Sequence, residues 1–278
     1  MPLGRGTAHA GISVLNAIGT GIGGALGIDL TLEVEVMESS SLSGWSNGHG
    51  LLDEEVLWAI HRVASGMGAS RTFHARVISL IPPSRGLKSS SALVNAMLAA
   101  VLEMHGVEAD RGEIARKGVE AARLAGLTIT GAYDDSLATL LPGVHITDNT
   151  KVRRLRTFPA PRAPVVLLIP REENPIQYID PSRFKAYKEL YMKAAKMALA
   201  GRWIDAIPIN SLATIHAAGL RDLWAPLEEA LSIKCTWTAG VSGKGPALFS
   251  ITSCPSTIVD LWRRQGDIIV TETRGDGT

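Results

Sequence analysis

The feature that most constrains this chain is a short segment that leads into a long apolar helix. Residues 82–92 read PPSRGLKSSSA, and the apolar stretch that follows contains no charge until Glu103. Prolines end the preceding element and serine favours a helix start, so the pattern predicts a strand at 72–80, a loop, and a helix at 89–105. One serine is enough to cap a helix, which leaves the other serines and Lys88 to be explained.

The same segment has the composition of an anion-binding site. A helix start presents unpaired N–H groups and the positive end of the helix dipole, and together these attract phosphate. Lys88 adds a positive charge, and a serine hydroxyl can serve a metal ion that is bound to phosphate. The segment does not match the GxxxxGK[ST] pattern of a Walker A loop. We therefore expect a phosphate site of another kind, with an ordinary serine-capped helix as the alternative.

Glycines crowd two further segments. Residues 8–28 contain a GxGxxG pattern, but a dinucleotide site needs a helix next, whereas the alternation at 29–37 predicts a strand. These glycines also interrupt any membrane span or signal peptide. The GxGxxG glycines at 19–24 fit either a tight loop or a loop whose backbone approaches a substrate closely. Residues 238–247 hold three glycines and Lys244 between two predicted strands, which fits either a phosphate-binding loop or a long hairpin loop.

Charge and cysteine content narrow the function. The 278 residues include 28 Lys and Arg against 27 Asp and Glu, which excludes the basic field of a general nucleic-acid binder. Cys235 and Cys254 match neither a CxxC pair nor a zinc framework, and so few thiols are typical of a reducing compartment. The seven histidines show no metal-ligand spacing. We expect a cytoplasmic protein with no nucleic-acid or membrane partner.

The order of the elements predicts an α+β fold in two domains. Strands and helices mix without strict alternation, and a charged strand from Lys151 followed by three prolines marks a boundary. We place the domains at 1–158 and 159–278. Further helices are expected at 53–65, 110–124, 181–200, 203–218, 223–232 and 255–265, and further strands at 165–169, 235–239, 247–252 and 267–273.

Two adjacent carboxylates, Asp134 and Asp135, follow a loop at Thr130. On general grounds such a pair more often caps a turn than carries out catalysis. The residues alone therefore favour a solvated cap, and a catalytic role needs further support.

Taken in order, these segments resemble the motifs of the GHMP kinase superfamily, which includes galactokinase, homoserine kinase and mevalonate kinase. The pattern PxxxGLxSSxA is matched at 82–92, the first motif resembles 4–27, and the glycine-rich third motif resembles 240–246. GLKSSSAxxNA at 86–96, together with AxAG near Ala8 and TGAYDD at 130–135, is most similar to archaeal-type shikimate kinases. The resemblance covers essentially the whole chain.

The resemblance implies a ribosomal-S5-domain-2-like N-terminal domain, a ferredoxin-like C-terminal domain, and ATP with Mg²⁺ between them. It implies that Ser90 and Glu120 bind the metal and that Asp134 is the catalytic aspartate. Lys88, which we expect to be exposed, departs from the glycine or alanine of many relatives and adds catalytic charge. The implied nucleotide-binding residues are Pro83, Ser84, Arg85, Gly86, Leu87, Lys88, Ser89, Ser90, Ser91, Gly240 and Gly243.

The implied reaction is phosphorylation of shikimate by ATP to shikimate 3-phosphate, in chorismate biosynthesis. The planar carboxylate of shikimate favours an arginine partner, for which Arg5, Arg85 and Arg153 are candidates. Thr7, His9 and Asn16 are candidates for the ring hydroxyls, although Asn16 is equally suited to satisfying backbone groups.

Two alternatives remain open. One is a kinase for homoserine or another small alcohol, and the other is a GHMP-fold protein that binds a nucleotide or metabolite without turnover. The presence of Asp134 and Glu120 favours an enzyme, because a binding protein needs no base. We expect Asp135 to point away from the site. The sequence does not indicate an oligomeric state.

Overall fold

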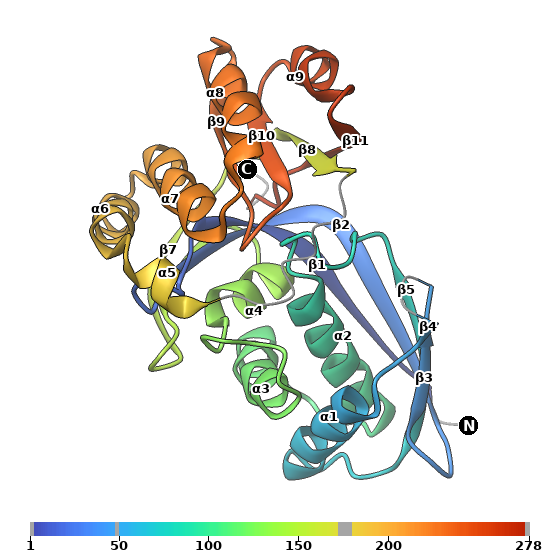
Figure 1. The fold of residues 1–278 in the computed structure, drawn as a ribbon. Helices are drawn as coiled ribbons and strands as arrows, with labels where there is room; N and C mark the ends of the chain where they lie inside the picture. Colours follow the sequence, from blue (N-terminus) through green and yellow to red (C-terminus); the bar gives the residue numbers. More distant parts are fainter. Residues whose placement is uncertain (1–2, 48–49, 172–179, 276–278) are drawn as a thin grey trace.

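The computed structural model describes residues 3–47, 50–171 and 180–275, which form two β-sheets and the helices that cover them (Figure 1). The strands are β1 (Leu3–Leu15), β2 (Ile22–Glu38), β3 (Ser43–Ser46), β4 (Gly50–Leu51), β5 (Phe73–Ser79), β6 (Val144–Asp148), β7 (Arg153–Phe158), β8 (Pro164–Pro170), β9 (Thr236–Val241), β10 (Leu248–Thr252) and β11 (Gly266–Glu272). The α-helices are α1 (Glu54–Gly66), α2 (Ser89–Met104), α3 (Arg111–Leu124), α4 (Tyr133–Leu140), α5 (Pro181–Lys185), α6 (Lys188–Leu199), α7 (Trp203–Ala218), α8 (Trp224–Ser232) and α9 (Pro255–Trp262).

The larger sheet is built around the long strand β2. One edge of β2 pairs with β1, and the other edge pairs with β5 at one end and with β6 at the other. Apart from β1, the strands of the larger sheet have the order β4-β3-β5-β2-β6-β7. The smaller sheet has the order β11-β8-β10-β9. Figure 1 shows α1, α2, α3 and α4 together on one face of the larger sheet. In the first half of β1, the side chains that point away from these helices are exposed.

The loop expected at the GxGxxG pattern is present in part, because Gly19 and Gly21 lie in the turn between β1 and β2, whereas Gly24 lies in β2. The earlier glycines lie in β1. In β1, Gly4 and Gly6 face α2, and a Cβ at either position would overlap a backbone carbonyl of that helix. Glycine therefore allows β1 and α2 to pack in close contact. Only the turn between β1 and β2 leaves the sheet.

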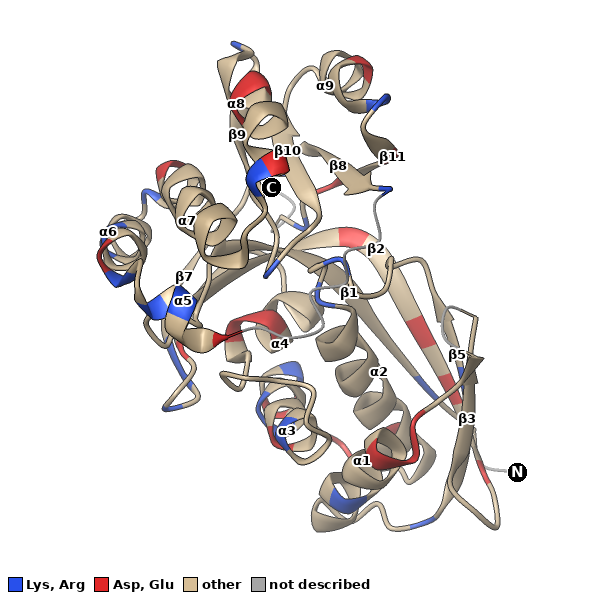
Figure 2. Ribbon diagram, viewed as in Figure 1, with Lys and Arg blue, Asp and Glu red and all other residues tan. Residues whose placement is uncertain are grey.

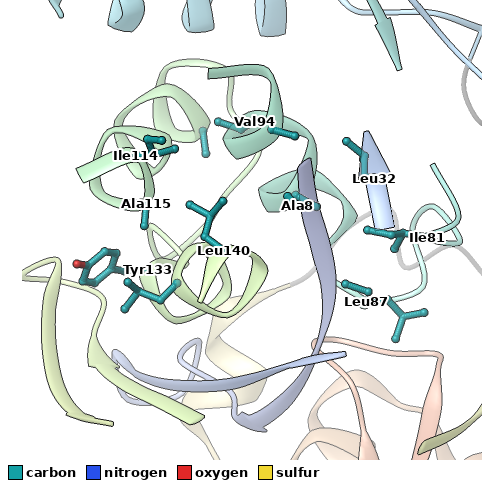
Figure 3. Packing of buried hydrophobic residues seen from close by; sticks show 14 of the residues in the cluster. Ala8, Leu32, Ile81, Leu87, Val94, Ile114, Ala115, Tyr133 and Leu140 are labelled. Carbon is teal, nitrogen blue, oxygen red and sulfur yellow. The ribbon is translucent and has the colours of Figure 1, made fainter. Parts of the chain in front are cut away.

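The helix α2 is at the centre of the main core. Most of its side chains are buried, and it carries almost no charged position, in contrast to α3 (Figure 2). Val94 of α2, Ile114 of α3 and Leu140 of α4 pack in the same cluster (Figure 3). This cluster continues into Leu167 of β8 and Phe249 of β10, so one core extends beneath both sheets.

The α+β class predicted from the sequence is confirmed. The helices expected at 53–65, 89–105, 110–124 and 203–218 are present, and the helix expected at 181–200 is interrupted between α5 and α6. The predicted boundary at 158/159 falls between the two sheets, since β7 ends at Phe158 and β8 begins at Pro164. Because the core is shared, the division into two domains stays a prediction.

The two cysteines are joined. Cys235 and Cys254 form a disulfide with a Cα–Cα distance of 5.9 Å, so the interpretation as two thiols is wrong. Disulfides are uncommon in most reducing compartments, and the cysteine count therefore no longer supports a cytoplasmic location, which stays a prediction. Within the described ranges, no helix is long and apolar enough to cross a membrane.

Candidate functional site

Three segments that are distant in sequence meet at one place. They are the C-terminal half of β1, the serine loop (residues 82–91) and the glycine loop (residues 242–247) between β9 and β10. The N–H of Gly11 donates to the Leu87 carbonyl at 3.2 Å, and the Ser242 hydroxyl donates to the Gly86 carbonyl at 2.8 Å. Gly86 has a φ of +81°, and a Cβ there would overlap the Ser242 carbonyl, so only glycine fits.

These segments border a cavity of about 580 Å³. Residues from α1, α4 and the segments after β4, α3 and β6 complete its wall, including Asp53, Thr130, Asp135 and Asn149. Of the residues predicted from the sequence, the cavity is lined by Asn16, Pro83, Ser84, Gly86, Lys88, Ser89, Ser90, Ser91, Asp134 and Gly243.

The N-terminus of α2 opens into this cavity. Lys88 is its N-cap residue, in the left-handed region with a φ of 68°, and no side chain in the described structure caps the helix. Ser89, Ser90 and Ser91 line the cavity instead, with Ser90 exposed. The serines therefore do not serve as the ordinary cap, and the helix start is free to bind an anion.

Lys88 is buried, contrary to the expectation of an exposed lysine. The residue is 9% exposed, its Nζ lies 2.8 Å from Asp135 Oδ1, and it donates to Ser13 Oγ at 2.6 Å. Ser13 Oγ also accepts from the N–H of Gly243 at 2.8 Å. The ammonium is thus held between β1, α4 and the glycine loop. A carboxylate and a hydroxyl inside the protein compensate for its loss of water.

Asp134 is the buried carboxylate of the cavity. It lies in the first turn of α4, is 3% exposed, and packs where a Cβ on Gly23 would come within 2.5 Å of its carboxylate. Burial and the neighbouring Asp135 raise the pKa of Asp134 to about 7, while Lys88 and a hydrogen bond from Asn149 act in the opposite direction. A base with a pKa near neutrality is suited to accepting a proton from an alcohol.

Asp135 does not point away from the site, so that expectation is wrong. Its carboxylate lines the same cavity and forms the ion pair with Lys88. The pair is formed because α4 presents both acids in its first turn, on the side that faces the serine loop.

Several predicted residues lie away from the cavity lining in the described structure. Arg5, Thr7 and His9 alternate with the residues that face α2, and Arg5 pairs with Glu35 at 3.1 Å on the exposed face of the sheet. Glu120 is exposed on α3, where it pairs with Lys117 at 3.0 Å. Four further residues also lie away from the lining. The carbonyl of Arg85 accepts from the N–H of Ala247, and Leu87 is part of the core. Arg153 lies on the exposed face of β7, and Gly240 packs against α7.

Asn16 lines the cavity but satisfies backbone groups, as its alternative interpretation anticipates. Its Nδ2 donates to the Gly243 carbonyl at 2.9 Å, and its Oδ1 accepts from the N–H of Ile18 at 3.0 Å. Its own N–H donates to Asn210 Oδ1 at 2.7 Å. Asn16 therefore ties the turn after β1 to the glycine loop.

Two residues of the site escape the sequence analysis. Ser13 connects Lys88 to the glycine loop, and Asn149 donates to Asp134 Oδ1 at 2.8 Å. Ser13 lies within the first motif but is one of several polar residues of β1, and Asn149 follows β6 like many turn residues. Only the fold brings them to the site.

Comparisons with known proteins agree with this geometry. Residues 54–143 match the family model described as GHMP kinases N terminal domain. A shikimate kinase from Aeropyrum pernix is 37% identical over 276 residues, covering 96% of each chain. A shikimate kinase from Pyrococcus furiosus is 36% identical, covering 98% of this chain and 99% of the relative.

The fold matches that of solved GHMP kinases. Homoserine kinase from Cytophaga hutchinsonii superimposes with a TM-score of 0.74 at 16% identity, covering 99% of this chain and 96% of the other. Mevalonate kinase from Methanococcus jannaschii gives a TM-score of 0.71 at 14% identity, with 98% of each chain covered. At such identities the likeness shows the fold alone, whereas the two relatives extend over almost the whole chain. The chain therefore belongs to the archaeal shikimate kinases of the GHMP kinase superfamily.

Proposed function

We propose that the protein transfers the γ-phosphoryl group of ATP to the 3-hydroxyl of shikimate. The observation that carries this proposal is the placement of a buried carboxylate with a raised pKa, Asp134, in the cavity into which the N-terminus of α2 opens. Phosphoryl transfer depends mainly on positioning and charge stabilisation, and this cavity offers a helix start, a lysine and a base. The near-full-length similarity to shikimate kinases supports shikimate as the acceptor.

The serine loop and the start of α2 would hold the nucleotide phosphates through backbone N–H groups and serine hydroxyls. Mg²⁺ usually takes one or two protein ligands and completes its shell with phosphates and water. The exposed hydroxyl of Ser90 fits this role, whereas Glu120 lies away from the cavity. Among the residues that the structure describes, no group of three or more His, Cys, Asp or Glu side chains could hold the ion alone.

Lys88 and Asp134 would act on opposite sides of the transfer. Lys88 supplies positive charge close to the helix start, where charge develops on the transferring phosphoryl group. Asp134 accepts the proton of the acceptor hydroxyl as that oxygen bonds to phosphorus and the bond to ADP breaks. Burial keeps water from competing at this carboxylate.

The acceptor is tested by measuring ADP release with shikimate, homoserine and mevalonate at the same enzyme and ATP concentrations. We expect Mg²⁺-dependent turnover with shikimate alone. Equal or faster turnover with homoserine would contradict the assignment of shikimate as the substrate. ATP binding without turnover on any of the three would favour a metabolite-binding protein over a kinase.

The pKa of Asp134 makes a prediction for the pH dependence. Only the deprotonated carboxylate is a base, so kcat/KM for shikimate should rise with pH and level off above a pKa of about 7. The slope on the acidic side should correspond to one proton. A profile that is flat from about pH 5 to 8 would show that Asp134 does not act as a base.

A further inference from the structure

The helix α4, which carries Asp134, begins without a cap of its own. Its N-cap residue, Ala132, is in the left-handed region with a φ of 45°, and within the described chain its first turn receives no side-chain hydrogen bond from that residue. The acceptor for the N–H groups of this first turn is the side chain of Asn149, from the turn after β6. Asn149 Oδ1 accepts from the N–H of Tyr133 at 3.1 Å and from the N–H of Asp134 at 3.4 Å.

These bonds fix the orientation of the Asn149 amide. Oδ1 also accepts from Thr147 Oγ1 at 2.6 Å, so a flip would turn Nδ2 toward three donors. The backbone of Asn149 is held as well, since its N–H donates to the Gly21 carbonyl at 2.9 Å and its carbonyl accepts from Arg123 at 3.2 Å. The side chain is 1% exposed. Nδ2 is therefore a fixed donor.

That fixed donor is directed at the catalytic carboxylate. Asn149 Nδ2 lies 2.8 Å from Asp134 Oδ1, and its second contact is a weaker one to Thr130 Oγ1 at 3.4 Å. A donor cannot accept a hydrogen bond, so Asp134 Oδ1 cannot carry a proton directed toward Asn149. Oδ1 is engaged by this donor, so Oδ2 is the oxygen better placed to take up a proton.

We propose that Asn149 is a positioning residue that holds Asp134 by Oδ1 and so reserves Oδ2 for the proton of the acceptor hydroxyl. The step rests on the proposed function. The hydroxyl proton moves to Oδ2 as the hydroxyl oxygen bonds to the γ-phosphorus and ADP leaves with the electron pair of the broken bond. The charged groups around Asp134 are Asp135 on α4, Lys88 before α2, and Arg123 of α3, which reaches Asn149 rather than Asp134.

The variant Asn149→Asp separates the two functions of the amide. It keeps an oxygen for the N–H groups of Tyr133 and Asp134 and for Thr147, and it replaces the donor by a second carboxylate oxygen. Loss of the donor and the added negative charge both favour protonated Asp134. We expect the acidic limb of kcat/KM for shikimate to move up by about 1–3 pH units. Activity at pH 7 should fall about 5-fold or more and recover at higher pH, while KM for ATP stays within about twofold.

Thr147→Val is the matched control, because it removes one donor to Oδ1 and leaves Nδ2 in place. Its acidic limb should not move. Asn149→Asp should also have no further effect on kcat in an Asp134→Asn background, since Asn149 acts through Asp134. An unmoved limb in folded Asn149→Asp, or an equal loss of kcat in both backgrounds, would overturn the proposal.

Folding is checked by thermal unfolding of every variant. If Asn149→Asp does not fold, the neutral variant Asn149→Ser also removes the amide donor, and its limb should again move upward; an unmoved limb there would overturn the proposal. Wild-type turnover is measured first. Absence of shikimate turnover in the wild type contradicts the proposed function, whereas a normal wild-type profile with an unmoved variant contradicts only the role of Asn149.

Discussion

Asp134→Asn is expected to lower kcat with shikimate by about 10²–10⁴-fold, the range that general-base catalysis usually contributes. The substitution keeps the shape of the side chain and removes the base. ATP binding should be nearly unchanged, because a group on the acceptor side interacts mainly in the transition state. The measurement is steady-state ADP release, with ATP affinity determined separately by calorimetry.

Asp135→Asn is the control at the neighbouring residue. We expect it to move the acidic limb of the pH profile downward, whereas Asn149→Asp moves it upward. Asp135 raises the pKa of Asp134, so its neutralisation should move the acidic limb to lower pH and cost less activity at pH 7. If Asp135→Asn proves the more damaging of the two, the base has been assigned one residue too early. If neither slows turnover, positioning alone carries the reaction.

The same substitution of Asp134 has a consequence for stability. The folded protein holds a proton on Asp134 up to a pKa of about 7, whereas the unfolded chain loses it near the ordinary value of 3.8. The unfolded state thus binds fewer protons between these values, and this group's contribution to stability falls as pH rises through that window. Asp134→Asn should unfold at a higher temperature than wild type near pH 8, and the difference should shrink toward pH 4. Unchanged unfolding temperatures would contradict the raised pKa.

Lys88→Met is the second substitution with a large expected effect. It removes the partner of Asp135 and the donor to Ser13, so it should reduce the free energy of unfolding as well as activity. Breaking a fully buried pair costs about 3–5 kcal/mol, but Asp135 retains 22% side-chain exposure, and we expect about 1–3 kcal/mol. Nucleotide affinity should weaken, and the limb set by Asp134 should move upward, because Lys88 lowers the pKa of that carboxylate.

Urea unfolding and calorimetric ATP titration measure the two effects separately. Lys88→Arg keeps the charge and serves as the control, although its larger fork does not fit the ammonium's contacts as well. A Lys88→Met protein with wild-type stability and kinetics would show that the ion pair contributes nothing to the site.

The sequence predicts those structural features that depend on neighbouring residues or on a repeating hydrophobic pattern. The proline stop, the serines and the apolar run of α2 are read directly, because capping and hydrophobic pattern act over a few residues. The sequence does not show why Gly4 and Gly6 are glycines, because the reason is a helix almost a hundred residues further along the chain that must pack against the strand. Isolated glycine is a weak indicator of a loop when a close approach of two backbones explains it equally well.

The candidate site shows the same division. The serine loop and Lys88 are predicted from their local composition and Asp134 from motif resemblance, and all three contribute to the cavity wall. Arg5, Thr7 and His9 are predicted from side-chain chemistry alone, but the alternation of the strand places them on the side opposite α2. Asn149 was not found, since a hydrogen bond between side chains 15 residues apart leaves no periodic signal.

The joining of three segments at the cavity also bears on the order in which this protein can acquire its site. The hydrogen bonds Lys88–Ser13, Ser242–Gly86 and Gly243–Ser13 connect residues that are 75, 156 and 230 positions apart. Contacts of such separation form late, because the entropy of closing long loops must be overcome before they become favourable. A chain emerging from the ribosome therefore has the helix start of α2 long before it has the glycine loop. The wall of the cavity is therefore complete only after the glycine loop has been synthesised.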